Sequence, residues 1–116
     1  MRGVQRSRLR PDHHALAEAL RRRVLEEPAE TDPGLRRAVA ASAAGGPAAP
    51  VPYEALARQI GGAACNVTDD HVARIVRAAG SEKAAFELIV TAAVGAGLLR
   101  WDRALKAVKE ARGAPA

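Results

Sequence analysis

Five stretches of the chain repeat apolar residues every three or four positions, the spacing that places side chains on one face of a helix. The first helix is expected over residues 12–27, with Asp12 as its N-cap and Pro28 as its stop. A second is expected to begin after Asp32, with Pro33 in its first position. No stretch alternates polar and apolar residues with the period of two typical of strands. The pattern therefore predicts an all-α fold.

Glycine and proline punctuate the middle of the chain. Residues 45–52, GGPAAPVP, are expected to form a linker, and a third helix is expected to start near Pro52 or Tyr53. Gly61 and Gly62 interrupt the apolar pattern of that helix, at a cost of about 1 kcal/mol each relative to alanine. The pair indicates either a close backbone crossing or the end of the helix.

Two helices are expected to follow each other with almost no loop. Thr68 is a suitable N-cap for a fourth helix, and Gly80 stands where a C-terminal glycine would end it. Ser81 can cap a fifth helix at once, over residues 82–112. The spacing predicts a helix–corner–helix arrangement. We expect two antiparallel helices and the long helix to form the core.

The fifth helix would be roughly 45 Å long at 1.5 Å per residue. We expect it to hold one broad apolar side, formed by Phe86, Ile89, Val90, Ala93, Val94, Gly97, Leu98, Trp101, Leu105 and Val108. The small residues around Gly95 and Gly97 indicate a tight helix contact or a kink. Trp101 is expected to make a contact within the chain or between subunits.

Alanine dominates the composition, with 28 alanines in 116 residues. Methyl groups contribute little transfer free energy, about 0.8 kcal/mol per buried CH₂-sized group. The length suits one domain, expected over residues 11–112, with a basic, poorly ordered stretch at 1–10 and a tail at 113–116. Because such a core is modest, we expect a homo-oligomer formed through the long C-terminal helix.

The charge balance is basic, at +5 with 15 arginines and 3 lysines. It permits nucleic-acid binding, which stays an alternative. However, Glu18, Glu26 and Glu27 lie at helical spacing from the arginines at 21–23, and no aromatic residue is interleaved with them. A solvated helix face is the preferred interpretation. With no signal-like apolar region and no run of 18 uncharged apolar residues, we expect a cytoplasmic protein outside the membrane.

Three short motifs stand between residues 67 and 98: VTDD at 67–70, AAGSE at 78–82, and FEL followed by AAVGAGL at 86–98. Through them, the segment 33–108 resembles the carboxymuconolactone decarboxylase-like superfamily, which includes the alkyl hydroperoxidase D proteins. The resemblance implies an all-α fold. It also implies a place where thiol chemistry would be found.

Active members of that superfamily carry the pattern Glu-x11-Cys-x2-Cys-x3-His, in which two cysteines work as a dithiol and the Glu and His relay protons. Aligned on the Ala-Ala-Gly that ends the fourth helix, the first cysteine falls on Cys65. The other three positions hold Tyr53, Thr68 and Val72. His71 and Glu54 each lie one residue away from the His and Glu positions of that pattern. A one-residue slip turns a helical side chain by about 100°, so these two residues do not restore the proton relay.

The resemblance makes Cys65, His71 and Glu54 the candidate catalytic residues, with no cofactor and no metal. Disulfide exchange requires attack by a second sulfur, and Cys65 is the only cysteine. The leading hypothesis is therefore a diverged, non-catalytic member that acts as an oligomeric structural or partner-binding protein. The alternative is a single-thiol antioxidant or oxidoreductase that uses Cys65.

Overall fold

The computed structural model describes residues 12–113, and within them every regular element is a helix. They are α2 (His13–Leu25), α3 (Pro33–Ala43), α4 (Tyr53–Ala63), a 3₁₀ turn η1 (Ala64–Asn66), α5 (Asp69–Ala79) and α6 (Glu82–Gly113). The all-α prediction is confirmed for this range, although α2 ends two residues earlier than predicted. The predictions for residues 1–10 and 114–116 lie outside the described part of the chain.

The predicted helix boundaries follow from local capping chemistry. The side chains of Asp12, Asp32 and Thr68 accept hydrogen bonds from the first turns of α2, α3 and α5. The Ser81 hydroxyl accepts one from the first turn of α6 at 3.1 Å. Gly80 ends α5 in the left-handed region at a φ of 92°, where a side chain would be strained. The predicted corner between α5 and α6 is present.

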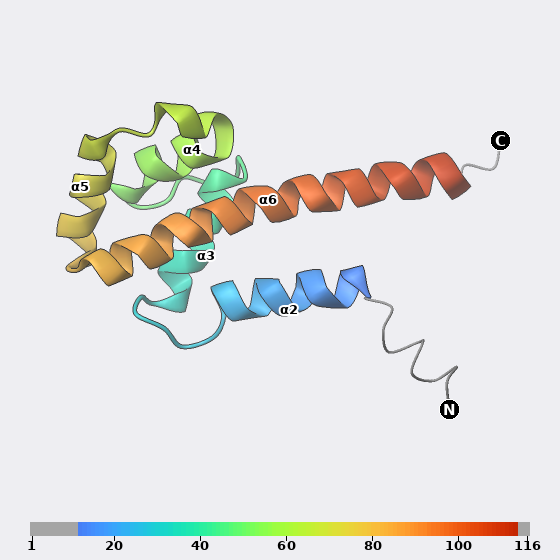
Figure 1. The fold of residues 1–116 in the computed structure, drawn as a ribbon, viewed down its shortest axis with the longest axis horizontal. Helices are drawn as coiled ribbons and strands as arrows, with labels where there is room; N and C mark the ends of the chain where they lie inside the picture. Colours follow the sequence, from blue (N-terminus) through green and yellow to red (C-terminus); the bar gives the residue numbers. More distant parts are fainter. Residues whose placement is uncertain (1–11, 114–116) are drawn as a thin grey trace.

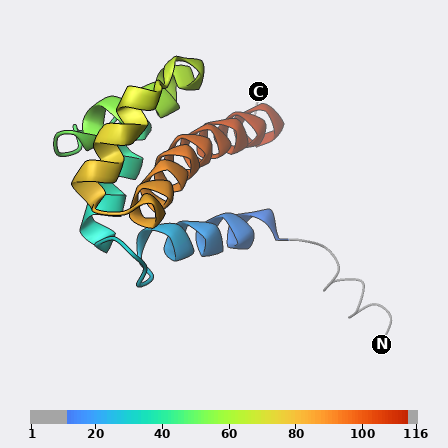
Figure 2. The same ribbon diagram turned by 60° about the vertical axis from the view of Figure 1, so that its left-hand side comes forward.

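α6 is the longest element and crosses the whole molecule (Figure 1). Its N-terminal half packs against α3, α4 and α5, and its C-terminal half extends past them. α2 packs beside this extended part, where the ring of His13 lies 6.2 Å from that of Trp101 (Figures 1 and 2).

Small residues let the central helices approach closely. A Cβ added to Gly61 of α4 would lie 1.8 Å from the Ala43 carbonyl oxygen of α3. One added to Gly95 of α6 would lie 2.6 Å from the Ala40 carbonyl oxygen. Both glycines therefore mark tight crossings against α3, as predicted, and α4 also ends two residues beyond Gly61. The alanine-rich α3 lies between its two neighbours because its own side chains are small.

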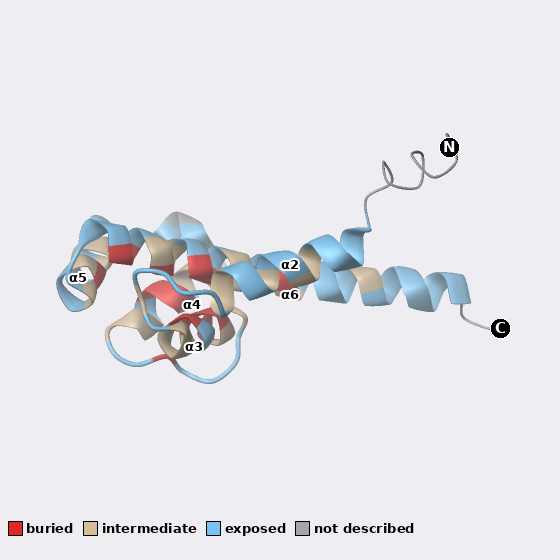
Figure 3. Ribbon diagram, turned by 90° about the horizontal axis from the view of Figure 1, so that it is seen from below, coloured by how far each residue is buried: buried red, intermediate tan, exposed pale blue. Residues whose placement is uncertain are grey.

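The core lies where α3, α4 and α6 meet, and α5 contributes one fully buried side chain, Ile75. The largest apolar residues buried from α4 and α6 are Leu56, Leu88 and Leu98. Most of the other buried positions are alanines. Figure 3 shows this buried zone in one part of the molecule, while α2 and the C-terminal half of α6 are largely exposed.

The broad apolar side predicted for α6 is mostly not the side that the helix buries. Leu98 of that side is buried, but four of its large residues are exposed: Phe86, Val90, Trp101 and Val108. The reason is that α6 is apolar around much of its circumference, and α3 and α4 cover one face only.

Candidate functional site

The residues proposed from the thiol-enzyme resemblance make local contacts. Cys65 lies in the turn η1, and its side chain lies outside what the structure describes. Glu54, in the first turn of α4, pairs with Arg58 of the same helix at 3.0 Å. His71 accepts a hydrogen bond at Nδ1 from the Thr68 amide at 3.1 Å. Glu54 and His71 are thus each engaged at the start of their own helix.

His71 and Thr68 form a reciprocal capping box. The Thr68 hydroxyl accepts from the His71 amide, while the His71 ring accepts from the Thr68 amide. Such a pair satisfies two backbone donors that the start of a helix leaves free. Thr68 therefore acts as the N-cap of α5, as its residue type predicts. Within residues 12–113, no group of three or more His, Cys, Asp or Glu side chains is placed to hold a metal ion.

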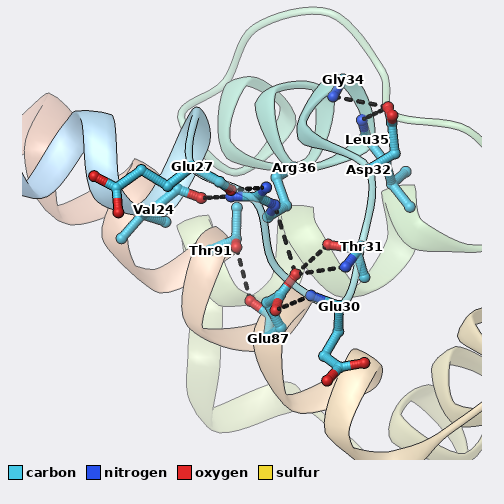
Figure 4. Close-up of polar contacts among 10 residues, drawn as sticks. All are labelled: Val24, Glu27, Glu30, Thr31, Asp32, Gly34, Leu35, Arg36, Glu87 and Thr91. Carbon is cyan, nitrogen blue, oxygen red and sulfur yellow. Dashed lines mark hydrogen bonds and ion pairs between the residues drawn. The ribbon is translucent and has the colours of Figure 1, made fainter.

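A buried polar network joins α2, α3 and α6, and the sequence reasoning missed it (Figure 4). The Arg36 side chain of α3 is only 1% exposed. Its guanidinium donates to the carbonyl oxygens of Val24 and Glu27, at the end of α2, and lies 3.5 Å from the Glu87 carboxylate of α6. Its position three residues before the buried Val39, on the inner face of α3, is the signal that could have identified it.

The Glu87 carboxylate is the acceptor at the centre of this network. It accepts hydrogen bonds from the backbone amides of Glu30 and Thr31, at 3.0 and 2.9 Å, and from the Thr31 hydroxyl. Burial acts to raise the pKa of Glu87, while the Thr31 hydroxyl, the two amides and the Arg36 charge lower it, and the result lies below the usual value. These partners all belong to the fold, so the network fastens the α2–α3 loop to α6.

The second notable feature is an apolar surface that nothing in residues 12–113 covers. We call it the α2/α6 face: Leu16 and Leu20 of α2 with Phe86, Val90, Trp101 and Val108 of α6. Phe86 is 67% exposed and Val108 is 52% exposed. Between the two helices lies a groove of about 380 Å³, lined mainly by apolar side chains that include Leu16, Leu20 and Trp101.

The exposed residues of α6 follow a helical stripe. Phe86, Val90, Ala93, Gly97, Trp101, Ala104 and Val108 are separated by three or four positions and share one side of the helix. All seven are exposed. Large exposed apolar patches are rare on monomeric proteins and are typical of interaction surfaces.

By length and composition alone, α6 is also long and apolar enough to cross a membrane. Of its 18 most apolar consecutive residues, 39% are buried inside the fold. The buried residues include Ala85, Leu88 and Ala92, which belong to the core.

Comparisons of the chain with models of known protein families, with curated proteins and with solved structures find no match.

Proposed function

We propose that this protein is a self-associating helical scaffold whose α2/α6 face binds a second copy of the chain. The single observation that carries the proposal is the row of large apolar side chains exposed on α6 and α2. Fully burying a side chain such as Phe, Leu or Val contributes about 1.5–3 kcal/mol each. An alanine-rich core leaves the monomer short of such burial, and dimerisation supplies it.

The size of the face suits a dimer. α6 has 32 residues, so it is about 48 Å long, and a strip about 10 Å wide along it offers on the order of 500 Å². With α2 added, each copy contributes on the order of 700 Å², close to the roughly 800 Å² per partner of a standard interface. A helix face with small residues in the middle also allows close approach of a second helix.

The residue pattern of α6 favours an antiparallel pairing of two identical copies about Gly97. In that register, Phe86 faces Val108 and Val90 faces Ala104, while Ala93 faces Trp101. Larger residues thus oppose smaller ones.

The charges at the two ends of α6 suit the same register. Glu82 in the first turn faces Arg112 in the last, and neither has an ion-pair partner in the described part of the chain. An isologous contact of this kind uses the same surface on both copies. A second copy therefore satisfies both the shape and the charge of the stripe.

We place the chain, as a proposal, among diverged members of the carboxymuconolactone decarboxylase-like superfamily without dithiol chemistry. The helix–corner–helix over residues 67–98 supports the placement. The loss of dithiol chemistry is supported by the single cysteine and by the capping role of Thr68. In this proposal α6 is the core helix of a water-soluble fold, because its inner stripe packs against α3 and α4.

Half of the arginines on the helix surfaces of residues 12–113 form ion pairs, which weakens the nucleic-acid alternative. Arg21 contacts Glu18 and Asp102, and Arg23 contacts Glu27. These are the paired, solvated surfaces expected of an ordinary helix exterior.

A matched pair of valine substitutions tests the proposal. Val108→Glu places a charge in the α2/α6 face, while Val51→Glu makes the same change in the α3–α4 loop, at a side chain that is 86% exposed. Both residues are open in the monomer, so neither change disturbs the core. In sedimentation velocity at matched concentration, we expect the wild type and Val51→Glu to be dimers and Val108→Glu to be a monomer. A monomeric wild type, or equal behaviour of the two variants, overturns the proposal.

A further inference from the structure

We propose that a pocket between α3, α4 and α6 binds a small phosphate-bearing molecule. The pocket has a volume of about 440 Å³, in the range of small-ligand sites. Three arginines line it: Arg58 from α4, and Arg100 and Arg103 from α6. Among the described residues that line it, none is acidic. The remaining wall is mostly glycine and alanine, which leaves room at the guanidinium groups.

Two of the three guanidinium groups keep donors that no contact within the described residues uses. Arg58 is paired with Glu54 and donates to the Gly46 carbonyl oxygen, whereas Arg100 makes one hydrogen bond, to the Gly61 carbonyl oxygen at 2.6 Å. Arg103 has no hydrogen-bond or ion-pair partner within residues 12–113. Each guanidinium carries five donors, so those of Arg100 and Arg103 remain available. Two positive charges that line one pocket, with no carboxylate among the described residues lining it, attract an anion.

The chemistry of the arginines favours phosphate among anions. A guanidinium presents a planar fork that binds phosphate oxygens through two parallel hydrogen bonds. Ser42, in the pocket wall, is 1% exposed, and its hydroxyl has no hydrogen-bond partner in the described part of the chain. The pocket wall thus contains a further polar group, the Ser42 hydroxyl, that is free to form a hydrogen bond with a ligand.

The pocket lies beside the proposed dimer contact. At 100° per residue, Ala96 and Arg103 project about 100° and 120° away from Gly97 around α6, whereas Arg100 is about 60° from it. A dimer formed through the stripe at Gly97 therefore comes nearer to Arg100 than to Arg103. The two proposals have separate readouts, sedimentation for the dimer and the glycine signals below for the pocket, so the failure of one is distinguishable from the failure of the other.

Nuclear magnetic resonance of the full chain labelled with ¹⁵N tests the site, with inorganic phosphate and adenosine monophosphate as probes at constant ionic strength. The amides of Gly45, Gly61 and Gly62 line the pocket and report on it. We expect saturable shifts of these glycine signals. Binding should be about tenfold weaker in Arg103→Gln, the loss of one charge-assisted contact, and unchanged in Arg77→Gln, an exposed arginine of α5.

Several outcomes overturn the proposal. One is the absence of saturable shifts at the pocket glycines with either probe. Another is an equal weakening by Arg103→Gln and Arg77→Gln, which indicates diffuse attraction to a basic surface. Duplex DNA as a third probe separates a polyanion from a small phosphate compound: binding of DNA alone, without either small probe, also overturns the site. Arg103→Lys is expected to retain intermediate affinity because it keeps the charge and loses the fork.

Discussion

Replacing Gly61 by alanine is the sharpest test of how the central helices pack. A Cβ at this position would lie 1.8 Å from the Ala43 carbonyl oxygen and 2.8 Å from the carbonyl carbon. Ordinary contact begins at about 3.4 Å, so the backbones of α3 and α4 must separate by roughly 1.5 Å. No side-chain rotation relieves this clash, because both groups in contact are fixed to helix backbones.

The expected magnitude follows from two opposing terms. Overpacking of a core costs about 1–3 kcal/mol, and a backbone clash belongs at the upper end of that range. Alanine in place of glycine in a helix recovers about 1 kcal/mol. The net loss expected for Gly61→Ala is about 2 kcal/mol, equivalent to a fall in Tm of about 10 °C for a chain of this size.

The adjacent glycine provides the control. A Cβ on Gly62 would meet no atom within 4 Å, so Gly62→Ala keeps the propensity gain without the clash and is expected to stabilise the protein by up to about 1 kcal/mol. Urea unfolding followed by circular dichroism at 222 nm, at one protein concentration, measures both variants. Equal stabilities of Gly61→Ala and Gly62→Ala would refute the close crossing of α3 and α4.

Three further predictions concern the buried network and the thiol. Arg36→Ala should cost about 3 kcal/mol in urea unfolding because it leaves the carbonyl oxygens of Val24 and Glu27 without their donor and removes a side chain that is only 1% exposed. Arg37→Ala removes an exposed pair worth at most about 1 kcal/mol, and equal losses from the two variants would contradict the role of Arg36 in the network. Since the folded pKa of Glu87 lies below its ordinary value of 4.5, its contribution to stability is full above that value and is lost as the pH falls through the folded pKa. Glu87→Gln should therefore flatten the fall in stability below about pH 4.5, and an unchanged slope would count against the assignment. Cys65→Ser should leave any peroxide turnover unchanged, and Cys-dependent turnover would restore the single-thiol hypothesis.

The helix boundaries could be predicted because they depend on neighbouring residues. Thr68, Gly80 and Ser81 act through hydrogen bonds and backbone preferences that span at most a few positions. The sequence also indicates that Gly61 and Gly95 are points of close contact between helices. It does not show that α3 is the helix they contact. Periodicity shows that a face is apolar, and it does not show which helix covers that face.

The buried network and the exposed stripe could not be predicted for the same reason. Arg36 is charged, so a hydrophobic pattern assigns it to the surface, and only the return of the α2–α3 loop over α6 buries it. Phe86 and Leu88 are equally apolar, yet α6 buries one and exposes the other. Which of the two side chains is buried depends on which helices pack against α6. That packing is a property of the tertiary structure.

Disulfide trapping at Gly97 tests the proposed antiparallel pairing of α6 most directly. Gly97 is exposed, a Cβ there meets no atom within 4 Å, and a two-fold axis at this residue brings the two copies of it together. In a Cys65→Ser background, Gly97→Cys should form a covalent dimer rapidly on mild oxidation, whereas Gly62→Cys, exposed on α4, should remain a monomer on the same timescale. Cross-linking of Gly97→Cys that is no faster than that of Gly62→Cys would contradict the account.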